Sequence, residues 1–145
     1  MKNSAIIKFQ SLSQNESFAR ICVSGFIAPL NPTVSQLADV KTAVSEAVTN
    51  AIVHGYPESV GEIEMRLYSD RNLVKIEIVD DGAGIDDVER AREPFYTTCC
   101  DGTRSGMGFM VMESFMDSVT VVSAIDEGTR VVMTKRIGKD SEMGI

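Results

Sequence analysis

The chain has 145 residues, of which 43% are hydrophobic and 24% are charged, and its formal net charge is −7. These values are typical of one globular domain with a full core and disfavour disorder. The acidic charge disfavours nucleic acid as the main partner, because phosphate binding uses clustered Lys and Arg. No apolar run reaches the roughly 20 residues of a membrane span. The start resembles no export signal, so we expect a cytoplasmic protein without membrane contact.

The first half of the chain predicts one strand and two helices. SAIIKFQSL predicts a short strand near the start. Residues 15–28 predict a helix that packs through one face, formed by Phe18, Ile21, Cys22, Gly25 and Phe26. Thr33 and Gln36 resemble a capping box that opens a second helix, which we expect to reach about Val53 and to stop at Gly55. Its core-facing residues are predicted to be Leu37, Val40, Val44, Ala47, Val48 and Ala51.

The second half predicts two hairpins separated by a loop and a helix. EIEMRLYS and LVKIEIVD alternate in polarity around a DRN turn, and SVTVVSAI and TRVVMTKR form the closing pair. Between them lie a short acidic helix, an aperiodic loop and a helix that packs on Phe109, Met112 and Met116. Because helices and hairpins are grouped, we expect an α+β two-layer sandwich, a mainly antiparallel sheet with helices on one face. One domain spans residues 1–145, and about the last eight residues form a loose tail.

Three polar side chains interrupt the apolar second helix at every fourth residue: Glu46, Asn50 and His54. Residues at this spacing are neighbours on one flank of a helix. Unpaired buried polar groups cost several kcal/mol at worst, so these side chains need partners. Two interpretations are open at this point: hydrogen bonds to nearby backbone in a purely structural role, or a ligand site.

Two glycine-rich segments add to the second interpretation. In DDGAG, Asp80 ends an apolar strand, where a carboxylate can accept from an exocyclic amine, and the glycines allow close approach to a ligand. In RSGMGF, Gly106 and Gly108 precede a helix whose amides and dipole favour phosphate, and Arg104 adds a bidentate donor. An ordinary turn or helix start explains each segment equally well when it is taken alone.

Together and in this order, the motifs resemble those of the GHKL, or Bergerat-fold, ATP-binding superfamily. That family carries E-x-x-x-N, then D-x-G-x-G, then a G-x-G after a mobile ATP lid. The matching residues are Glu46 and Asn50, then Asp80, Gly82 and Gly84, then Gly106 and Gly108. Gly128 and Thr129 match the closing strand motif, in which a threonine supports the adenine-binding aspartate. The resemblance implies the Bergerat fold, with ATP or ADP and Mg²⁺ as cofactors.

The same resemblance implies a role for each matching residue. Asp80 accepts from the adenine amino group with support from Thr129, Asn50 supplies an oxygen to Mg²⁺, and Glu46 is the catalytic base. The implied nucleotide-binding set also contains His54, Gly82, Gly84, Ile85, Thr97, Thr98, Ser105, Gly106, Met107 and Gly108. Arg104 is the candidate for contact with the γ-phosphate, with a plain lid surface charge as the alternative. For His54 the alternative is a structural role at the helix end.

Longer segments resemble the anti-sigma F factors of endospore-forming bacteria: NESFAR, SEAVTNAIVHGYP, PFYTTCCDGTRSGMGF and FMDSVTVVS. Such proteins are serine kinases that phosphorylate an anti-anti-sigma factor and also sequester a sporulation sigma factor. The resemblance implies both partners and a homodimer. It also implies docking through Glu16 and Arg20, which the spacing places on the exposed side of the first helix, opposite Phe18 and Phe26. A surface salt bridge between the two residues explains the pair equally well.

Other functions stay open. One is an anti-sigma kinase from a stress-response system, and another is an ATP-gated binding module without phosphotransfer. Glu46 argues against the gated module, because nucleotide sensing needs no base. A histidine-kinase core is disfavoured by the lack of a dimerisation segment, and topoisomerase, MutL and Hsp90 functions require transducer domains for which the chain has no room. The kinase hypothesis requires Asn50 and Asp80 to open into one pocket.

Overall fold

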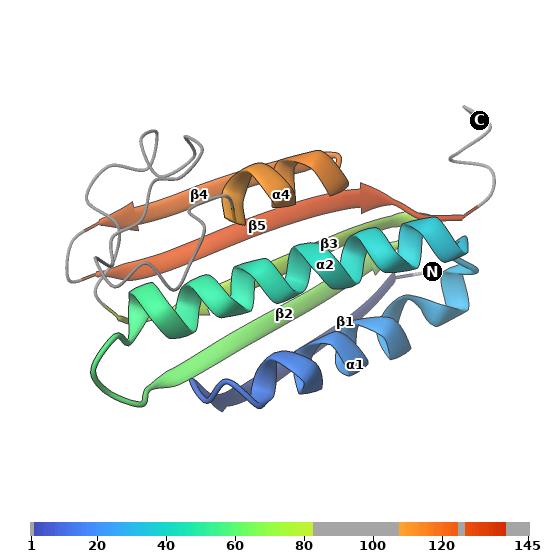
Figure 1. Ribbon diagram of the computed structural model, residues 1–145. Coiled ribbons are helices and arrows are strands. Elements are labelled where there is room, and N and C mark those ends of the chain that lie inside the picture. The colour runs from blue at the N-terminus through green and yellow to red at the C-terminus, as the bar shows by residue number, and fades with distance from the viewer. Residues whose placement is uncertain (1, 83–107, 125–126, 139–145) are drawn as a thin grey trace.

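The computed structural model describes residues 2–82, 108–124 and 127–138. Its elements are β1 (Lys2–Gln10), α1 (Asn15–Ile27), η1 (Ala28–Leu30), α2 (Val34–Asn50), η2 (Ala51–Gly55), β2 (Glu62–Asp70), β3 (Leu73–Asp80), α4 (Gly108–Phe115), β4 (Ser118–Ala124) and β5 (Gly128–Arg136). The strands form one antiparallel sheet in the order β1-β2-β3-β5-β4. The described helices α1, α2 and α4 cover one face of that sheet (Figure 1). This is the two-layer α+β architecture that the sequence predicts.

The core lies between α2 and the middle strands. Along β2 and β3, every second residue points toward the helices and is buried, as the alternation of the sequence predicts. α2 lies between α1 and α4 and contacts both of them. The largest fully buried side chains are Ile27, Ile63, Met65, Leu67, Ile76, Ile78, Met112, Met133 and Ile137. None of the helices in the described ranges is both long and apolar enough to cross a membrane.

The start of α2 confirms the predicted capping box. The hydroxyl of Thr33 accepts from the Gln36 amide, and the Gln36 side chain accepts from the Thr33 amide, each at 3.1 Å. The same buried Gln36 side chain exchanges two hydrogen bonds with the backbone of Gly138, just after β5. Of the stripe predicted to face the core, Leu37 alone is only partly buried. The N-terminal end of α2 is therefore hydrogen-bonded to the segment that follows the C-terminal end of β5.

The predicted buried face of α1 is wrong. The structure buries Ala19, Val23 and Ile27, whereas Phe18 is 44% exposed and Ile21 is 71% exposed. Gly25 is exposed as well, and Cys22 and Phe26 are only partly buried against the core. Both sets have helical spacing, but they differ by about one residue, which rotates the buried face by roughly 100°. Phe18 instead packs edge-on against Phe9 of β1, with ring centroids 6.1 Å apart.

The end of the second helix also differs from the prediction. The α-helix ends at Asn50, and a π-helical turn continues the rotation from Ala51 to the predicted stop at Gly55. A π turn has i→i+5 hydrogen bonds, so its side chains are offset from those of an α-helix. His54 therefore does not continue the regular four-residue flank of Glu46 and Asn50. Such turns are frequent at functional sites.

Candidate functional site

Asp80 is the buried acid of the site. It is the last residue of β3 and pairs in register with Thr129 of β5 and Ile63 of β2. Its carboxylate is 5% exposed and accepts from the backbone amide of Gly82 at 2.9 Å and from the backbone amide of Thr129. Burial raises the pKa of Asp80 to about 6, against the opposing effect of the two amides, and the neighbouring charge of Asp81 adds to the rise. A partly desolvated carboxylate at a strand end is a strong acceptor for a ligand amine.

Three backbone segments meet around Asp80 at distances that a side chain would prevent. A Cβ at Gly55 would lie 2.7 Å from Asp80 Oδ1, and a Cβ at Gly82 would lie 1.9 Å from the carbonyl oxygen of Gly55. A Cβ at Gly128 would lie 2.1 Å from the carbonyl oxygen of Asp80, and Gly128 has a φ of +81°. The sequence predicts glycine at position 82 for approach to a ligand. In the structure the close neighbour of Gly82 is the protein's own π turn.

Glu46 and Asn50 meet at the start of α4. A Cβ at Gly108 would lie 2.9 Å from Asn50 Nδ2, 3.3 Å from Asn50 Oδ1 and 3.2 Å from Glu46 Oε2. Both side chains are half-buried on α2, one helical turn apart, as the predicted motif requires. The amide and the carboxylate are therefore held beside the first residue of a helix, where backbone amides favour anionic oxygens.

One small cavity joins the two halves of the site. Asn50 from α2 and Asp80 from β3 both line it, together with Gly55, Thr129 and Phe109 of α4. Asn50 and Asp80 therefore open into the same cavity, as the sequence predicts. The cavity measures about 10 Å³, close to the room for one water molecule.

The donor set fits a magnesium nucleotide. Mg²⁺ takes oxygen ligands and usually keeps several waters and phosphate oxygens, so one or two protein oxygens suffice. Asn50 Oδ1 provides such an oxygen beside Gly108. The described ranges contain no cluster of three His, Cys, Asp or Glu, which disfavours an all-protein cage for a softer metal in this part of the chain.

Thr129 lies beside Asp80, as the resemblance implies, but its backbone amide is the group that reaches the carboxylate. Its hydroxyl pairs with Ser123 Oγ of β4 at 2.7 Å, and that same Oγ donates to the carbonyl of Gly128 at 3.0 Å. Ser123 is absent from the predicted set, and no local motif marks it. His54 is half-buried in the π turn. The remaining predicted residues lie outside the described ranges: Gly84, Ile85, Thr97, Thr98, Arg104, Ser105, Gly106 and Met107.

Sequence reasoning also missed Tyr56, the first residue after the π turn. Its hydroxyl accepts from the backbone amide of Asp81 at 2.9 Å and donates to the carbonyl of Glu62 at 2.8 Å. Tyr56 therefore joins the end of η2 to the start of β2 and the end of β3. Its place directly before Pro57 gives no signal of this contact, because Asp81 is distant in sequence.

The predicted docking residues are placed differently from the expectation. Glu16 and Arg20 are half-buried, and neither lies on a fully exposed side of α1. The Glu16 carboxylate accepts from the hydroxyl of Thr49 of α2 at 3.1 Å, and Arg20 Nη2 donates to Ser17 Oγ at 3.4 Å. The salt bridge considered as their alternative is absent from the described part of the chain. The prediction of an exposed pair was wrong because α1 is rotated relative to the predicted face.

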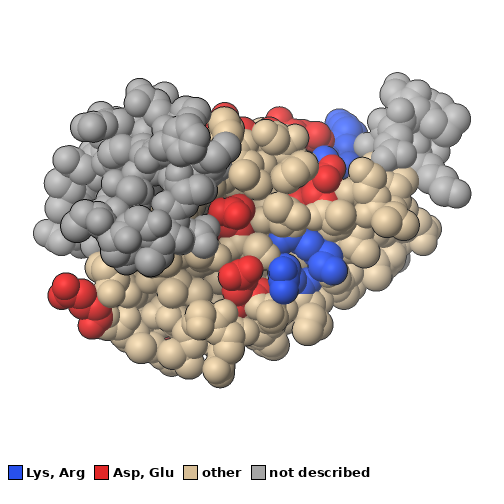
Figure 2. Space-filling model, viewed as in Figure 1, with Lys and Arg blue, Asp and Glu red and all other residues tan. Residues whose placement is uncertain are grey.

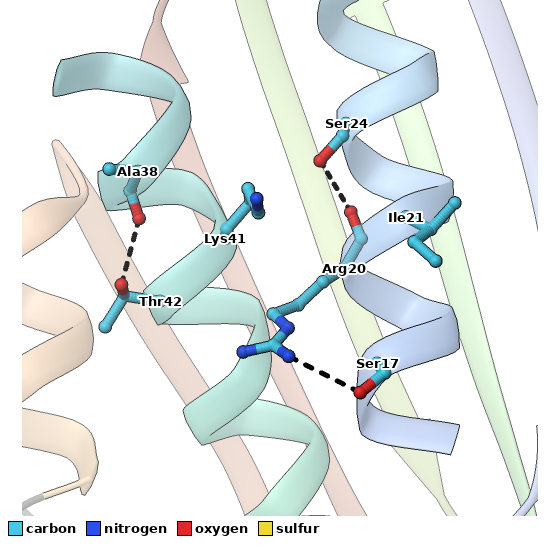
Figure 3. A pocket seen from close by; sticks show the side chains of 7 residues that line it. All are labelled: Ser17, Arg20, Ile21, Ser24, Ala38, Lys41 and Thr42. Atoms are coloured by element: carbon cyan, nitrogen blue, oxygen red, sulfur yellow. Dashed lines mark hydrogen bonds between the residues drawn. The ribbon is translucent and has the colours of Figure 1, made fainter. Parts of the chain in front are cut away.

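Arg20 instead lies at a groove between α1 and α2. The groove measures about 630 Å³ and is lined by Ser17, Arg20, Ile21, Ser24, Ala38, Lys41 and Thr42. Figure 3 shows the Arg20 side chain reaching across toward α2, while Lys41 rises from the facing helix. None of the described residues that line the groove is acidic. Figure 2 shows a group of basic side chains on the face that carries the helices, next to separate acidic side chains.

Comparison with known proteins agrees with this architecture. Residues 17–135 match the family described as "Histidine kinase-like ATPase domain". The chain is 51% identical to the anti-sigma F factor of Thermoanaerobacter sp. (strain X514), over 92% of this chain and 94% of that protein. It is 47% identical to the anti-sigma F factor of Bacillus subtilis (strain 168), over 99% of each chain.

Solved structures show the same fold at low sequence identity. A crystal structure of the RsbU and RsbW domains of Rv1364c from Mycobacterium tuberculosis matches with a TM-score of 0.66 at 18% identity, covering 93% of this chain and 32% of that one. The catalytic domain of the histidine kinase ThkA matches with a TM-score of 0.56 at 15% identity, covering 92% and 96%. These neighbours establish a GHKL-type fold. With the two curated relatives, they lead to one conclusion: the chain belongs to the anti-sigma F factor family and is built as a histidine kinase-like ATPase domain.

Proposed function

We propose that this protein is a serine protein kinase and anti-sigma factor. It uses Mg-ATP to phosphorylate a serine of an anti-anti-sigma protein, and it binds a sporulation sigma factor of the sigma F type in the cytoplasm. The family membership supports the sigma-factor partner. The observation that carries the kinase half is the convergence of Asn50 and Asp80 on one cavity, with Glu46 beside Asn50 at Gly108.

The two ends of that site suit the two ends of the nucleotide. The Asp80 carboxylate accepts a hydrogen bond from the exocyclic amine of adenine and is kept in place by the amides of Gly82 and Thr129. At the other end, Asn50 holds the metal, which neutralises charge on the phosphates when it is bound. The amide nitrogens at the start of α4 would donate to the phosphate oxygens. The bound molecule would therefore lie along η2 and the C-terminal half of α2.

Glu46 provides the chemistry that ATP binding alone does not need. Phosphoryl transfer requires positioning, charge neutralisation and a group that orients the attacking oxygen. The Glu46 carboxylate takes the proton of the partner's serine hydroxyl while the serine oxygen forms its bond to the γ-phosphorus. The bond between that phosphorus and the β–γ bridging oxygen breaks, and ADP leaves. Glu46 then returns the proton to solvent.

The groove between α1 and α2 is the proposed docking surface for protein partners. Arg20 and Lys41 place two cations at one groove that lacks an acidic lining residue among those described. Like charges on facing helices repel each other, so an acidic partner segment relieves that repulsion on binding. Glu16 contributes indirectly, since its bond to Thr49 holds α1 against the helix that carries Asn50.

We also propose a homodimer. Among the described strands, β1 lies at the edge of the sheet and pairs with β2 alone. An edge strand of nine residues offers a row of backbone donors and acceptors to a second copy. Sedimentation of the purified protein tests this proposal, and a monomer at micromolar concentration would remove it without affecting the kinase assignment.

The decisive experiment mixes the protein with Mg-ATP and the anti-anti-sigma protein encoded in the same genome. Mass spectrometry then measures the phosphate on each partner. The proposal expects one phosphate on a single serine of the anti-anti-sigma protein and none when Mg²⁺ is chelated. Normal ATP binding without any transfer would instead support an ATP-gated binding module, and transfer to a histidine would contradict the serine-kinase assignment.

A further inference from the structure

The peptide group between Asp80 and Asp81 is held by contacts at both its N–H and its C=O. Its N–H, on Asp81, donates to the Tyr56 hydroxyl at 2.9 Å. Its C=O, on Asp80, lies against Gly128, where a Cβ would come within 2.1 Å of the oxygen. The same residue, Asp80, holds its carboxylate with the Gly82 amide at 2.9 Å. The orientation of the proposed adenine acceptor therefore depends on the orientation of this peptide.

The Tyr56 hydroxyl is itself held by two further contacts. It donates to the carbonyl of Glu62 at 2.8 Å, at the start of β2. The ring covers Gly61 so closely that a Cβ there would lie 2.2 Å from Cε1 of Tyr56. Burial raises the pKa of the Tyr56 phenol above its ordinary value, so the hydroxyl keeps its proton at neutral pH. Ring and hydroxyl thus have separate partners, and their roles can be separated by substitution.

We propose that Tyr56 is a positioning residue of the nucleotide site: its hydroxyl fixes the Asp80–Asp81 peptide so that the Asp80 carboxylate faces the adenine amine. This role rests on the proposed function, because Tyr56 would hold the adenine end of that site in its binding geometry before the nucleotide arrives. A fixed acceptor loses less freedom when the ligand binds, which raises affinity without a new contact to the ligand.

The position of Tyr56 predicts an effect on one kinetic parameter only. Tyr56 touches the strand end that carries Asp80, whereas Glu46 and Asn50 meet at Gly108. Loss of the hydroxyl therefore weakens binding of the base and leaves the phosphoryl-transfer step unchanged. KM for ATP rises, and kcat stays constant.

The test compares Tyr56→Phe with a control, Tyr68→Phe. Tyr68 is an exposed tyrosine of β2, and its side chain lies on the sheet face away from the helices. Calorimetry with ADP measures affinity, and the transfer assay measures KM and kcat. Losing one hydrogen bond to a held group corresponds to about a 5-fold effect. We expect Tyr56→Phe to raise the Kd for ADP and the KM for ATP by about that factor, with kcat within 2-fold of wild type. Tyr68→Phe should match wild type in all three.

Amide hydrogen exchange provides a second measurement that does not depend on the assay. In Tyr56→Phe the Asp81 amide should exchange faster, while the Gly61 amide, which donates to Ser11 Oγ, keeps its protection. Unchanged ADP affinity in Tyr56→Phe, or a lower kcat at unchanged KM, would overturn the positioning role. Wild-type protein that binds no ADP at all would overturn the proposed function itself, so the two failures are distinct.

Discussion

The carboxylate of Asp80 lies directly against the backbone of Gly55, so closely that a Cβ at Gly55 would stand 2.7 Å from Oδ1. Gly55 ends the π turn that follows the helix of Glu46 and Asn50. The contact therefore fixes the distance between the helix of the proposed metal ligand Asn50 and the proposed adenine acceptor. A helix that continued in α geometry would place its last residue elsewhere.

We predict that Gly55→Ala weakens nucleotide binding more than it weakens folding. The added methyl group must displace the Asp80 side chain or shift the end of the π turn, and either movement misplaces the acceptor. We expect ADP affinity to fall at least 10-fold in calorimetry, roughly the effect of one misplaced charge-assisted hydrogen bond. Gly25→Ala is the control, because a Cβ at Gly25, in the last turn of α1, meets nothing within 4 Å. It should leave affinity unchanged and raise the free energy of unfolding by about 0.5–1 kcal/mol.

The raised pKa of Asp80 predicts two pH effects. Burial moves the pKa from 3.8 in an exposed carboxyl to about 6 in the folded state, so the folded protein binds the extra proton between these values. Folding stability due to this group is therefore greatest below pH 4 and falls as the pH rises toward 6. Nucleotide affinity has the opposite dependence, because the ionised carboxylate is the better acceptor.

Comparison with Asp80→Asn isolates this carboxyl from the others in the chain. The free energy of unfolding of wild type minus that of the variant should decrease between pH 4 and pH 7 and then stay level. ADP binding to wild type should strengthen over the same interval, while the variant binds weakly throughout. A difference curve that rises with pH would mean that the pKa is lowered in the folded state.

The sequence predicted the parts of this molecule that depend on local pattern. Alternation located the strands that bury Ile63 and Ile78, and the capping box at Thr33 located the start of α2. The face of α1 could not be predicted in this way, because two sets of residues have helical spacing and only packing against α2 and β2 selects Val23. The contact of Tyr56 with Asp81 was likewise invisible, since its partners meet only after the sheet has formed.

Glu46 should be needed for transfer and dispensable for binding. Glu46→Gln keeps the shape and half-buried position of the side chain but removes the base, so we expect the transfer rate to fall roughly 10²- to 10⁴-fold. ADP affinity should stay within about 3-fold of wild type, since the adenine contacts are unchanged. Glu58→Gln, at an exposed position after the π turn, is the control for loss of one negative charge. An undiminished transfer rate in Glu46→Gln would assign the base to another residue.

Ser45 carries a buried hydroxyl that meets no hydrogen-bond partner among the described residues. An unpaired buried polar atom costs about 1–3 kcal/mol, and alanine is the better helix former. Ser45→Ala should therefore raise the free energy of unfolding by about 1 kcal/mol in urea denaturation. Ser11→Ala is the matched control, because the equally buried Ser11 hydroxyl accepts from the Gly61 amide at 2.9 Å. That change should lower stability by about the same amount, and an equal sign for both variants would contradict the argument.

Arg20 tests the docking groove independently of catalysis. Arg20→Glu reverses one of the two charges that face the groove while Lys41 keeps the other, so an acidic partner segment meets repulsion where it met attraction. We expect binding of the sigma factor or the anti-anti-sigma protein to weaken at least 10-fold by calorimetry at low salt, with less difference from wild type at high salt. ADP affinity should not change, because Arg20 touches neither Asp80 nor Asn50. Lys75→Glu, on β3 and on the sheet face away from the helices, changes net charge by the same amount away from the groove. If it weakens partner binding as much as Arg20→Glu, the effect belongs to overall charge and the groove is not the docking surface.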